Sequence, residues 1–394
     1  MSGEHPTTFP APGLVNHATS TLSRGMRTIP SATGALIDDD QLIACWDEFE
    51  DPRLRWVMEL ALQQNSDAAP IERRLLDAGY PAPPSDDADA IGTRRALLIQ
   101  LARSIADARY WLHETEMIER QLKMTNGHLK LAEKRFAGAG DEEVASLRKA
   151  KARLTKLRNR FVSERNRTLG VTETLIGRPL TEALRVALGD QPSFRLIRVK
   201  QEIPANELRN RCDVQVAEKT LRNSANRTDI PEARWMSALA LRGAIQPSQR
   251  ETGPTPIDPM AIQLGELGEL ELSMPDGRVA SQSRLAQAMT NYSMTVHTAS
   301  DRARQLLTSY VELRAEVDAL SDARNKLDDR LNDLAETYEL GRGDVEELLQ
   351  LQSDAVDAER ELHVAEQKLA QIAIDLFVAI GGPCRWETRR LMGY

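Results

Sequence analysis

The sequence is poor in aromatic residues and in cysteine, and it contains no long apolar run. Phe, Trp and Tyr make up only 4% of its 394 residues, whereas Leu, Ala, Arg, Glu and Asp dominate. This composition is typical of paired helices with a thin core. The three cysteines lie far apart, which indicates neither a zinc site nor a redox pair. The absence of any run of about eighteen apolar residues excludes a transmembrane helix.

Patterns typical of catalysis and cofactor binding are also absent. The six histidines are scattered, and none has a partner three or four residues away that would build a metal-binding helix face. There is no glycine-rich loop followed by Lys and Ser or Thr, and no nucleophile elbow. The run Asp38–Asp40 is interpreted as a solvated loop or helix start rather than a metal site. We therefore expect no enzymatic activity and no cofactor.

One stretch of the chain occurs twice, with the copies separated by about two hundred residues. Each copy contains Leu-Ala-Glu, then Gly-x-Gly-Asp, then a closing Gly-x-Pro. The matched segments are Leu131–Glu133, Gly138–Asp141 and Gly177–Pro179, then Leu334–Glu336, Gly341–Asp344 and Gly381–Pro383. This repetition predicts an internally duplicated protein.

Each copy predicts a long helical hairpin. Apolar residues before the second Gly-x-Gly repeat in heptads, with Arg324 in one core position, and apolar residues follow at helical spacing from Val345 to Leu376. The first copy has the same arrangement around its own glycines. Because the turns are short, the helices of each pair should pack antiparallel. The heptad residues are Leu313, Val317, Leu320, Leu327, Leu331 and Leu334, and those of the first copy are Leu122, Leu129, Leu131, Val144, Leu147, Leu154, Leu157 and Phe161.

Charge is spread unevenly along the chain. The net charge of −8 argues against nucleic-acid binding by the whole protein. Residues 120–167 nevertheless carry 14 Lys and Arg against 5 Asp and Glu, while residues 301–376 carry 9 against 19. One interpretation is a surface for nucleic acid or an acidic partner. The favoured one is that the basic hairpin lies beside an acidic hairpin, within or between subunits, since aromatics for base stacking are almost absent.

The only convincing strand pattern lies between the two copies. Residues 235–243 and 262–274 alternate apolar and polar side chains, and a Pro-, Gly- and Thr-rich loop separates them. Such alternation fits a membrane β-strand with one lipid face. An ordinary amphipathic hairpin is the alternative, and Glu266 on the apolar face favours it.

Several phrases, in this order along the chain, resemble those of the TolC-like outer-membrane efflux proteins. Trp46, Phe49, Asp51 and Leu54 belong to a segment similar to the N-terminal W-x-x-F-x-D-P-x-L phrase of that family. The other similar phrases are Leu175–Pro179, Ile203–Val214, Pro275–Arg278, Tyr338–Gly341, Leu348–Gln352 and Ile380–Gly382. The resemblance implies a mainly α protein whose β-hairpin segment contributes to a membrane β-barrel. It also implies a homotrimer that works with a periplasmic adaptor and an inner-membrane pump, in contact with outer-membrane lipid.

The resemblance also implies site residues. The hairpin tips would bind the adaptor, and an acidic ring would narrow the tunnel just beyond the tip. Glu347 matches one acidic position and Gln350 stands where a second acid is usual, although Glu347 is equally well interpreted as a surface residue of an acidic helix. The implied adaptor-binding residues are Gly138, Ala139, Gly140, Gly341, Arg342 and Gly343.

The sequence departs from the family in its first half. Residues 65–91 contain no strand-like segment, so a trimer would supply about six strands, too few for an open lumen. Cys212 replaces a usual proline, and the N-terminus lacks the pattern of a secretory signal. A non-channel helical scaffold that binds partners is therefore the alternative function. The outer membrane and periplasm are the location implied by resemblance, and the cytoplasm is expected if Met1 is the true start.

The predicted organisation has six parts. They are a disordered leader (1–40), the first helical repeat (41–200), a helical connection (201–230), the β-hairpin segment (231–276), the second helical repeat (277–382) and a C-terminal tail (383–394).

Overall fold

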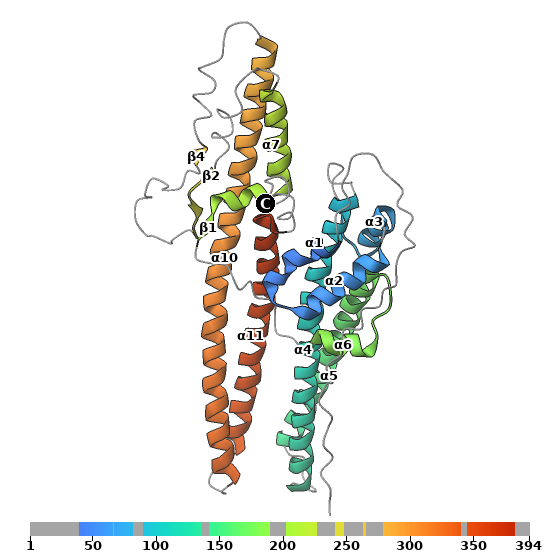
Figure 1. The fold of residues 1–394 in the computed structure, drawn as a ribbon. Helices are drawn as coiled ribbons and strands as arrows, with labels where there is room; N and C mark the ends of the chain where they lie inside the picture. The colour runs from blue at the N-terminus through green and yellow to red at the C-terminus, as the bar shows by residue number, and fades with distance from the viewer. Residues whose placement is uncertain are drawn as a thin grey trace, which may run out of the picture. The chain divides into compact units, whose positions relative to one another are not determined.

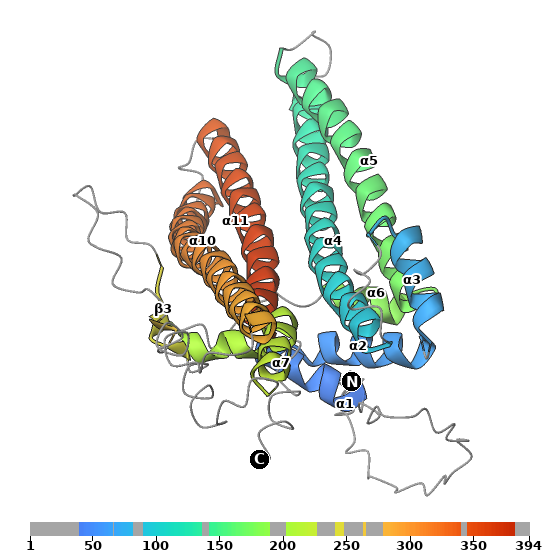
Figure 2. The same ribbon diagram turned by 90° about the horizontal axis from the view of Figure 1, so that it is seen from above.

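Four long helices dominate the computed structural model. It describes residues 39–65, 67–81, 90–135, 142–189, 202–226, 241–247, 263–264, 279–339 and 345–382, all within the unit Ile37–Tyr394. α4 packs along α5 and α10 packs along α11, so each repeat is a helical hairpin, as predicted (Figure 1). α4 also contacts α11, which joins the hairpins. Figure 2 shows the two helix pairs, α4 with α5 and α10 with α11, from above. The bounds are α4 (Ala90–Arg135), α5 (Glu142–Ile176), α10 (Val279–Glu339) and α11 (Val345–Ala379).

The heptad register of the second hairpin is as predicted, but its core becomes shallower toward the tip. Leu313 and Val317 are buried, with exposed fractions of 8% and 1%. Arg324 takes a half-buried position and pairs with Asp328 at 2.9 Å between Nη2 and Oδ2. The remaining heptad positions are only half-buried: Leu320, Leu327, Leu331 and Leu334.

The first hairpin shows the same trend. Leu122, Leu129 and Phe161 are buried. Phe161 lies in the half of α5 that is farther from the linker between α4 and α5. The apolar positions of α5 that are nearer to this linker are only half-buried. These positions are Val144, Leu147, Leu154 and Leu157. The halves of the hairpins nearest their linkers are therefore held by narrow seams.

A short N-terminal helical segment packs against α4 and α5 of the first repeat and also touches α11 of the second. It consists of α1 (Asp39–Ala44), the 3-10 helix η1 (Cys45–Phe49), α2 (Pro52–Gln64) and α3 (Ala68–Asp77). The ring centroid of Phe377 on α11 lies 5.0 Å from that of Trp46 and 5.3 Å from that of Phe49. The scarce aromatic residues are thus concentrated where the N-terminal segment meets the second hairpin, at a separation typical of favourable ring pairs.

The closing glycine of each repeat has the same structural role. Gly177 and Gly381 follow α5 and α11 with φ of 86° and 77°, a left-handed conformation that glycine adopts without steric cost. A Cβ on Gly381 would lie 2.4 Å from the backbone carbon of Asn210, and one on Gly177 would overlap the guanidinium of Arg74. Both glycines therefore end a long helix and let another segment approach closely.

Short strands connect the region between the repeats. β2 (Leu241–Arg242) pairs antiparallel with β4 (Gln263–Leu264), which is where the predicted β-hairpin should pair; its other residues lie outside the described ones. β1 (Ile203–Pro204) pairs with β3 (Ala244–Ile245). Between these two strands the chain forms the 3-10 helix η3 (Ala205–Asn210) and the helix α7 (Cys212–Ala225). This second pair was not predicted, because two residues are too few to show an alternating pattern. Among the described residues, no helix has the length and apolarity needed to cross a membrane.

Candidate functional site: the distal halves of the hairpins

The predicted adaptor-binding residues belong to the two linkers at the hairpin ends. α4 ends at Arg135 and α5 begins at Glu142, while α10 ends at Glu339 and α11 begins at Val345. The assignment of the linker residues to adaptor binding therefore stays a prediction. Gly138, Ala139, Gly140, Gly341, Arg342 and Gly343 all lie outside the described residues.

Glu347 and Gln350 lie in the first turns of α11, and both are exposed. Gln350 Nε2 donates a hydrogen bond to Asp354 Oδ1 at 2.9 Å. Polar residues continue along the same face of α11, because they follow one another at spacings of three and four residues: Glu347, Gln350, Asp354, Asp357 and Glu361. All five are exposed. We call Glu347, Asp354, Asp357 and Glu361 the acidic row of α11. Of these four residues, only Glu347 was among the predicted site residues, although the seven-residue spacing of Glu347, Asp354 and Glu361 is present in the sequence.

α5 carries a row of basic residues on an exposed face. Lys149, Arg153, Lys156 and Arg160 are spaced by four, three and four residues and are all exposed. Within the described part of the chain, none of the four forms an ion pair. We call these residues the basic edge of α5.

α10 carries a row of the opposite charge. Its five acidic residues are exposed, and heptad-like spacing puts them on one face. Among the described residues they form no ion pair either. We call this row the acidic edge of α10: Asp318, Asp322, Asp329, Asp333 and Glu336.

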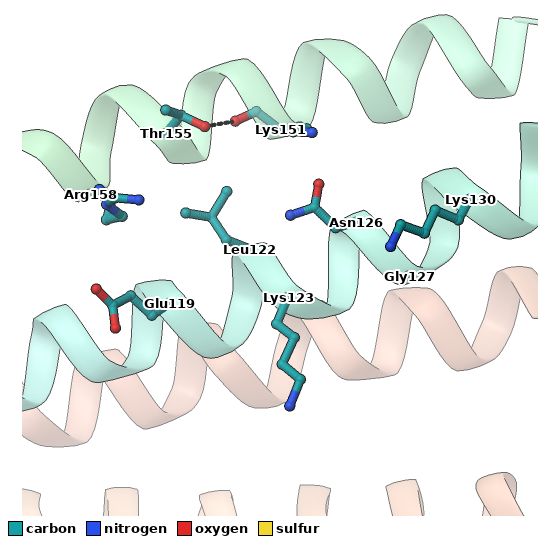
Figure 3. A pocket seen from close by; sticks show the side chains of 9 residues that line it. All are labelled: Glu119, Leu122, Lys123, Asn126, Gly127, Lys130, Lys151, Thr155 and Arg158. Atoms are coloured by element: carbon teal, nitrogen blue, oxygen red, sulfur yellow. Dashed lines mark hydrogen bonds between the residues drawn. The ribbon is translucent and has the colours of Figure 1, made fainter.

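A groove of about 580 Å³ lies between α4 and α5 (Figure 3). Lys151 and Arg158 line it from α5, and Lys123 and Lys130 line it from α4, against the single acid Glu119. The groove is therefore strongly cationic. Its other lining residues are Leu122, Asn126, Gly127 and Thr155, whose Oγ1 donates to the carbonyl oxygen of Lys151 at 2.8 Å.

The contact between the two repeats is rich in polar pairs. Arg103 of α4 pairs with Asp375 of α11 at 2.5 Å, and Asp107 accepts hydrogen bonds from Gln367 and Gln371 at 2.9 Å each. Directional polar contacts of this kind favour one arrangement of the helices. At a half-buried site, replacing such a hydrogen bond by one to water costs little free energy. The contact is therefore suited to changes in packing between hairpins.

Farther along the same contact, two charged residues of α11 face α4. The neighbouring His363, whose Nε2 lies 3.9 Å from Oε1, and a hydrogen bond from Arg120 lower the pKa of Glu359 to about 2. Burial alone would lower the pKa of His363, but the nearby carboxylate of Glu359 and the hydrogen bond between Nδ1 and Glu366 raise it to about 9. The prediction that no histidine has a partner three or four residues away was wrong, because Glu359 and Glu366 stand at these spacings from His363. The sequence analysis also did not predict that Cys212 is disulfide-bonded.

Comparison with known proteins identifies this architecture. No family model matches the chain. CusC matches with a TM-score of 0.64 at 14% identity, over 86% of this chain and 99% of that chain. The Campylobacter jejuni CmeC outer membrane channel matches with a TM-score of 0.53 at 15% identity, over 94% and 97%. The chain has the fold of the TolC-like outer-membrane channels.

The TolC-like fold is accompanied by sequence similarity to two curated proteins. Nodulation protein T of Rhizobium leguminosarum bv. viciae is 25% identical over 325 residues, which are 79% of this chain and 66% of that protein. Nodulation protein T of Rhizobium leguminosarum bv. trifolii is 26% identical over 204 residues, 50% of this chain and 40% of that protein. The matches span less than two thirds of each relative.

The residues of the N-terminal segment that resembles the TolC-like family have structural roles in this fold. Trp46 and Phe49 fill the base of the molecule, and Asp51 accepts hydrogen bonds from the backbone N–H groups of Arg53 and Leu54 to start α2. These residues position the hairpins rather than a reacting group.

Proposed function

We propose that this chain is one subunit of a trimeric outer-membrane channel through which exported compounds pass unchanged. A periplasmic adaptor and an inner-membrane pump complete the assembly. The fold supports the channel, and the similarity to outer-membrane channels supports the location. The relation between the edges of α5 and α10 supports the assembly.

The main support for the proposed assembly is the opposite charge of the basic edge of α5 and the acidic edge of α10. In the order of packing, α5 contacts α4, α4 contacts α11, and α11 contacts α10, so α5 and α10 are the outer members of the row. α10 presents the acidic edge and α5 presents the basic edge, of which Lys149 and Arg153 also line a groove of about 550 Å³ shared with α4 and α11, opposite Asp357. A head-to-tail contact between copies would bring the two edges together, and repeated head-to-tail contacts close a ring when the rotation permits. Charge complementarity would then fix which edges meet.

The acidic row of α11 gives the channel a charge preference. We place Glu347, Asp354, Asp357 and Glu361 along the conducting path, where three symmetry-related copies would present twelve carboxylates in three parallel rows. Rings of carboxylates attract cations and hinder anions. Gln350 interrupts the row without removing its charge, since its amide hydrogen-bonds to Asp354.

The hairpin linkers would meet the adaptor. Residues 136–141 and 340–344 connect helices whose neighbouring turns contain few buried apolar side chains among the described residues, Leu129 and Leu351 being two of them. Such ends can adapt to a partner at low cost because few apolar contacts must be broken. This role is supported by the family resemblance of the linker glycines.

Charge reversal tests the assembly. The triple variant Lys149→Glu, Arg153→Glu, Lys156→Glu should lower the trimer fraction, measured by native mass spectrometry of the purified full chain. Adding Asp322→Lys, Asp329→Lys and Asp333→Lys should restore it, because the edges again carry opposite charges. A control with Arg73→Glu and Lys219→Glu, exposed residues of α3 and α7, should remain trimeric. A basic-edge variant as trimeric as the wild type would contradict the proposed interface, and a monomeric wild type would favour the non-channel scaffold.

A further inference from the structure

Two histidines and one glutamate from different repeats come together at the contact between α4 and α11. His113 comes from α4, and Glu359 and His363 come from α11; one ligand atom of each lies within 4.8 Å of the others. We propose that these three side chains bind one divalent transition-metal ion of the zinc class, which joins the first hairpin to the second. This site is separate from the proposed conducting function.

The distances fit a small inward movement of side chains. Nε2 of His113 and Nε2 of His363 each lie 3.9 Å from Oε1 of Glu359. In tetrahedral zinc sites, bonds of about 2.0–2.1 Å place neighbouring ligand atoms roughly 3.3 Å apart. These two pairs therefore need to close by roughly 0.6 Å, and the two histidine ligand atoms start within 4.8 Å of each other, a range that side-chain rotation covers without moving a helix. Glu359 and His363 are four residues apart and share one face of α11.

His363 is already held in the orientation that a metal ligand needs, and because its pKa is raised to about 9, metal binding would displace the proton from Nε2. Its Nδ1 lies 3.1 Å from Oε2 of Glu366, and its Nε2 points to the other members of the cluster. Metal-binding histidines commonly donate the second ring N–H to a carboxylate, which fixes both the tautomer and the ring plane. Glu366 therefore acts as a positioning residue.

His113 brings a ligand atom without a hydrogen-bond partner. Its Nε2 is buried and accepts or donates no hydrogen bond among the described residues. Its ring centroid lies 3.7 Å from that of His363, so the rings already occupy adjacent positions. A buried polar nitrogen left unpaired costs free energy, and a metal bond would remove that cost.

The surrounding charge favours a cation. Glu114 and Glu116 of α4 and Glu366 of α11 face the cluster, against Arg120 and Arg360. Arg120 Nη2 lies 3.0 Å from Glu359 Oε1, but its side chain is 52% exposed. Because a carboxylate has two oxygens, Arg120 can remain bonded to Oε2 when Oε1 binds a metal. Three protein ligands leave a fourth position for water, and imidazole with carboxylate suits zinc, cobalt and nickel.

Cobalt and zinc titrations of the purified full chain test the site. We expect one Co²⁺ per chain, with the visible absorption of a four- or five-coordinate ion, and displacement by Zn²⁺. His113→Gln and His363→Gln should each weaken binding by at least about tenfold, and Glu366→Gln should weaken it by about 10- to 100-fold. His297→Gln, an exposed histidine of α10, is the matched control and should bind as the wild type does.

Thermal unfolding provides a second readout. Zn²⁺ should raise the unfolding temperature of the wild type and of His297→Gln but not that of Glu359→Gln, whose side chain keeps its size and can still bond to Arg120. Failure of the wild type to bind Co²⁺ at millimolar concentration would overturn the proposal. So would loss of binding in His363→Gln with unchanged binding in His113→Gln, since the metal would then not join the two hairpins.

Discussion

Arg109 of α4 and Asp51, the residue that caps α2, form an ion pair with 2.6 Å between Nη2 and Oδ2, and their side chains are only 5% and 7% exposed. Arg109 Nε also donates to the carbonyl oxygen of Leu188 at 3.1 Å, in α6 (Glu182–Gly189). Burial lowers the pKa of Arg109, and the charge of Asp51 opposes that effect. One guanidinium thus joins three segments at the base of the first hairpin.

The first prediction concerns this pair. Arg109→Met should lower the free energy of unfolding by about 3–5 kcal/mol, because it leaves the buried carboxylate of Asp51 without its partner. Urea unfolding of the two proteins measures the difference. Arg73→Met is the control, since Arg73 is 84% exposed and lies 3.9 Å from Asp77, a surface pair worth about 0–1 kcal/mol. Equal losses in the two variants would contradict the structural role of Arg109.

The second prediction tests the change in core depth along α10. Leu307→Ala should cost about 2–5 kcal/mol because Leu307 is fully buried. Leu327→Ala makes the same chemical change at a half-buried heptad position and should cost less than half as much. Denaturant midpoints measured side by side give the ratio. A larger loss at Leu327 would mean that the distal seam is deeper than described.

The third prediction concerns the closing glycines. Gly381→Ala should destabilise the protein by more than the roughly 1–2 kcal/mol of left-handed strain alone, because the new Cβ would also collide with the backbone at Asn210. Gly79→Ala, at φ of 86° but in open space, should show the strain without the collision. Thermal unfolding distinguishes them, and equal effects would show that residues 210–211 move aside.

A glycine within a helix should behave in the opposite way. Gly170 lies in α5 with nothing within 4 Å of the position of a Cβ. Gly170→Ala should therefore stabilise the protein by about 0.5–1 kcal/mol. A loss of stability on the same unfolding assay would contradict the described surroundings of this position.

The hairpins were predictable because helical periodicity is local. Leu313, Val317 and Phe161 fall in the core because residues three and four apart share one helix face. Their shallow continuation toward the tips was not predictable, since burial depends on the width of the packed partner. The residue spacing determines which side chains face the partner helix, whereas the tertiary packing determines how deeply these side chains are buried.

The remaining features depend on residues that are distant in the sequence. Asp51 and Arg109, like His113 and His363, lie on different helices, so no spacing rule brings them together. The acidic row of α11 is different, because Glu347, Asp354 and Glu361 recur every seven residues and were readable from the start. The family resemblance by itself points only to Glu347 and Gln350.

The fifth prediction is also the most direct test of the channel. Purified full-length protein in a planar lipid bilayer should conduct, and its reversal potential in a salt gradient should show a preference for cations. Neutralising the acidic row with Glu347→Gln, Asp354→Asn, Asp357→Asn and Glu361→Gln should remove that preference, while Asp77→Asn on α3 should leave it unchanged. A correctly folded trimer that conducts no ions would contradict the account.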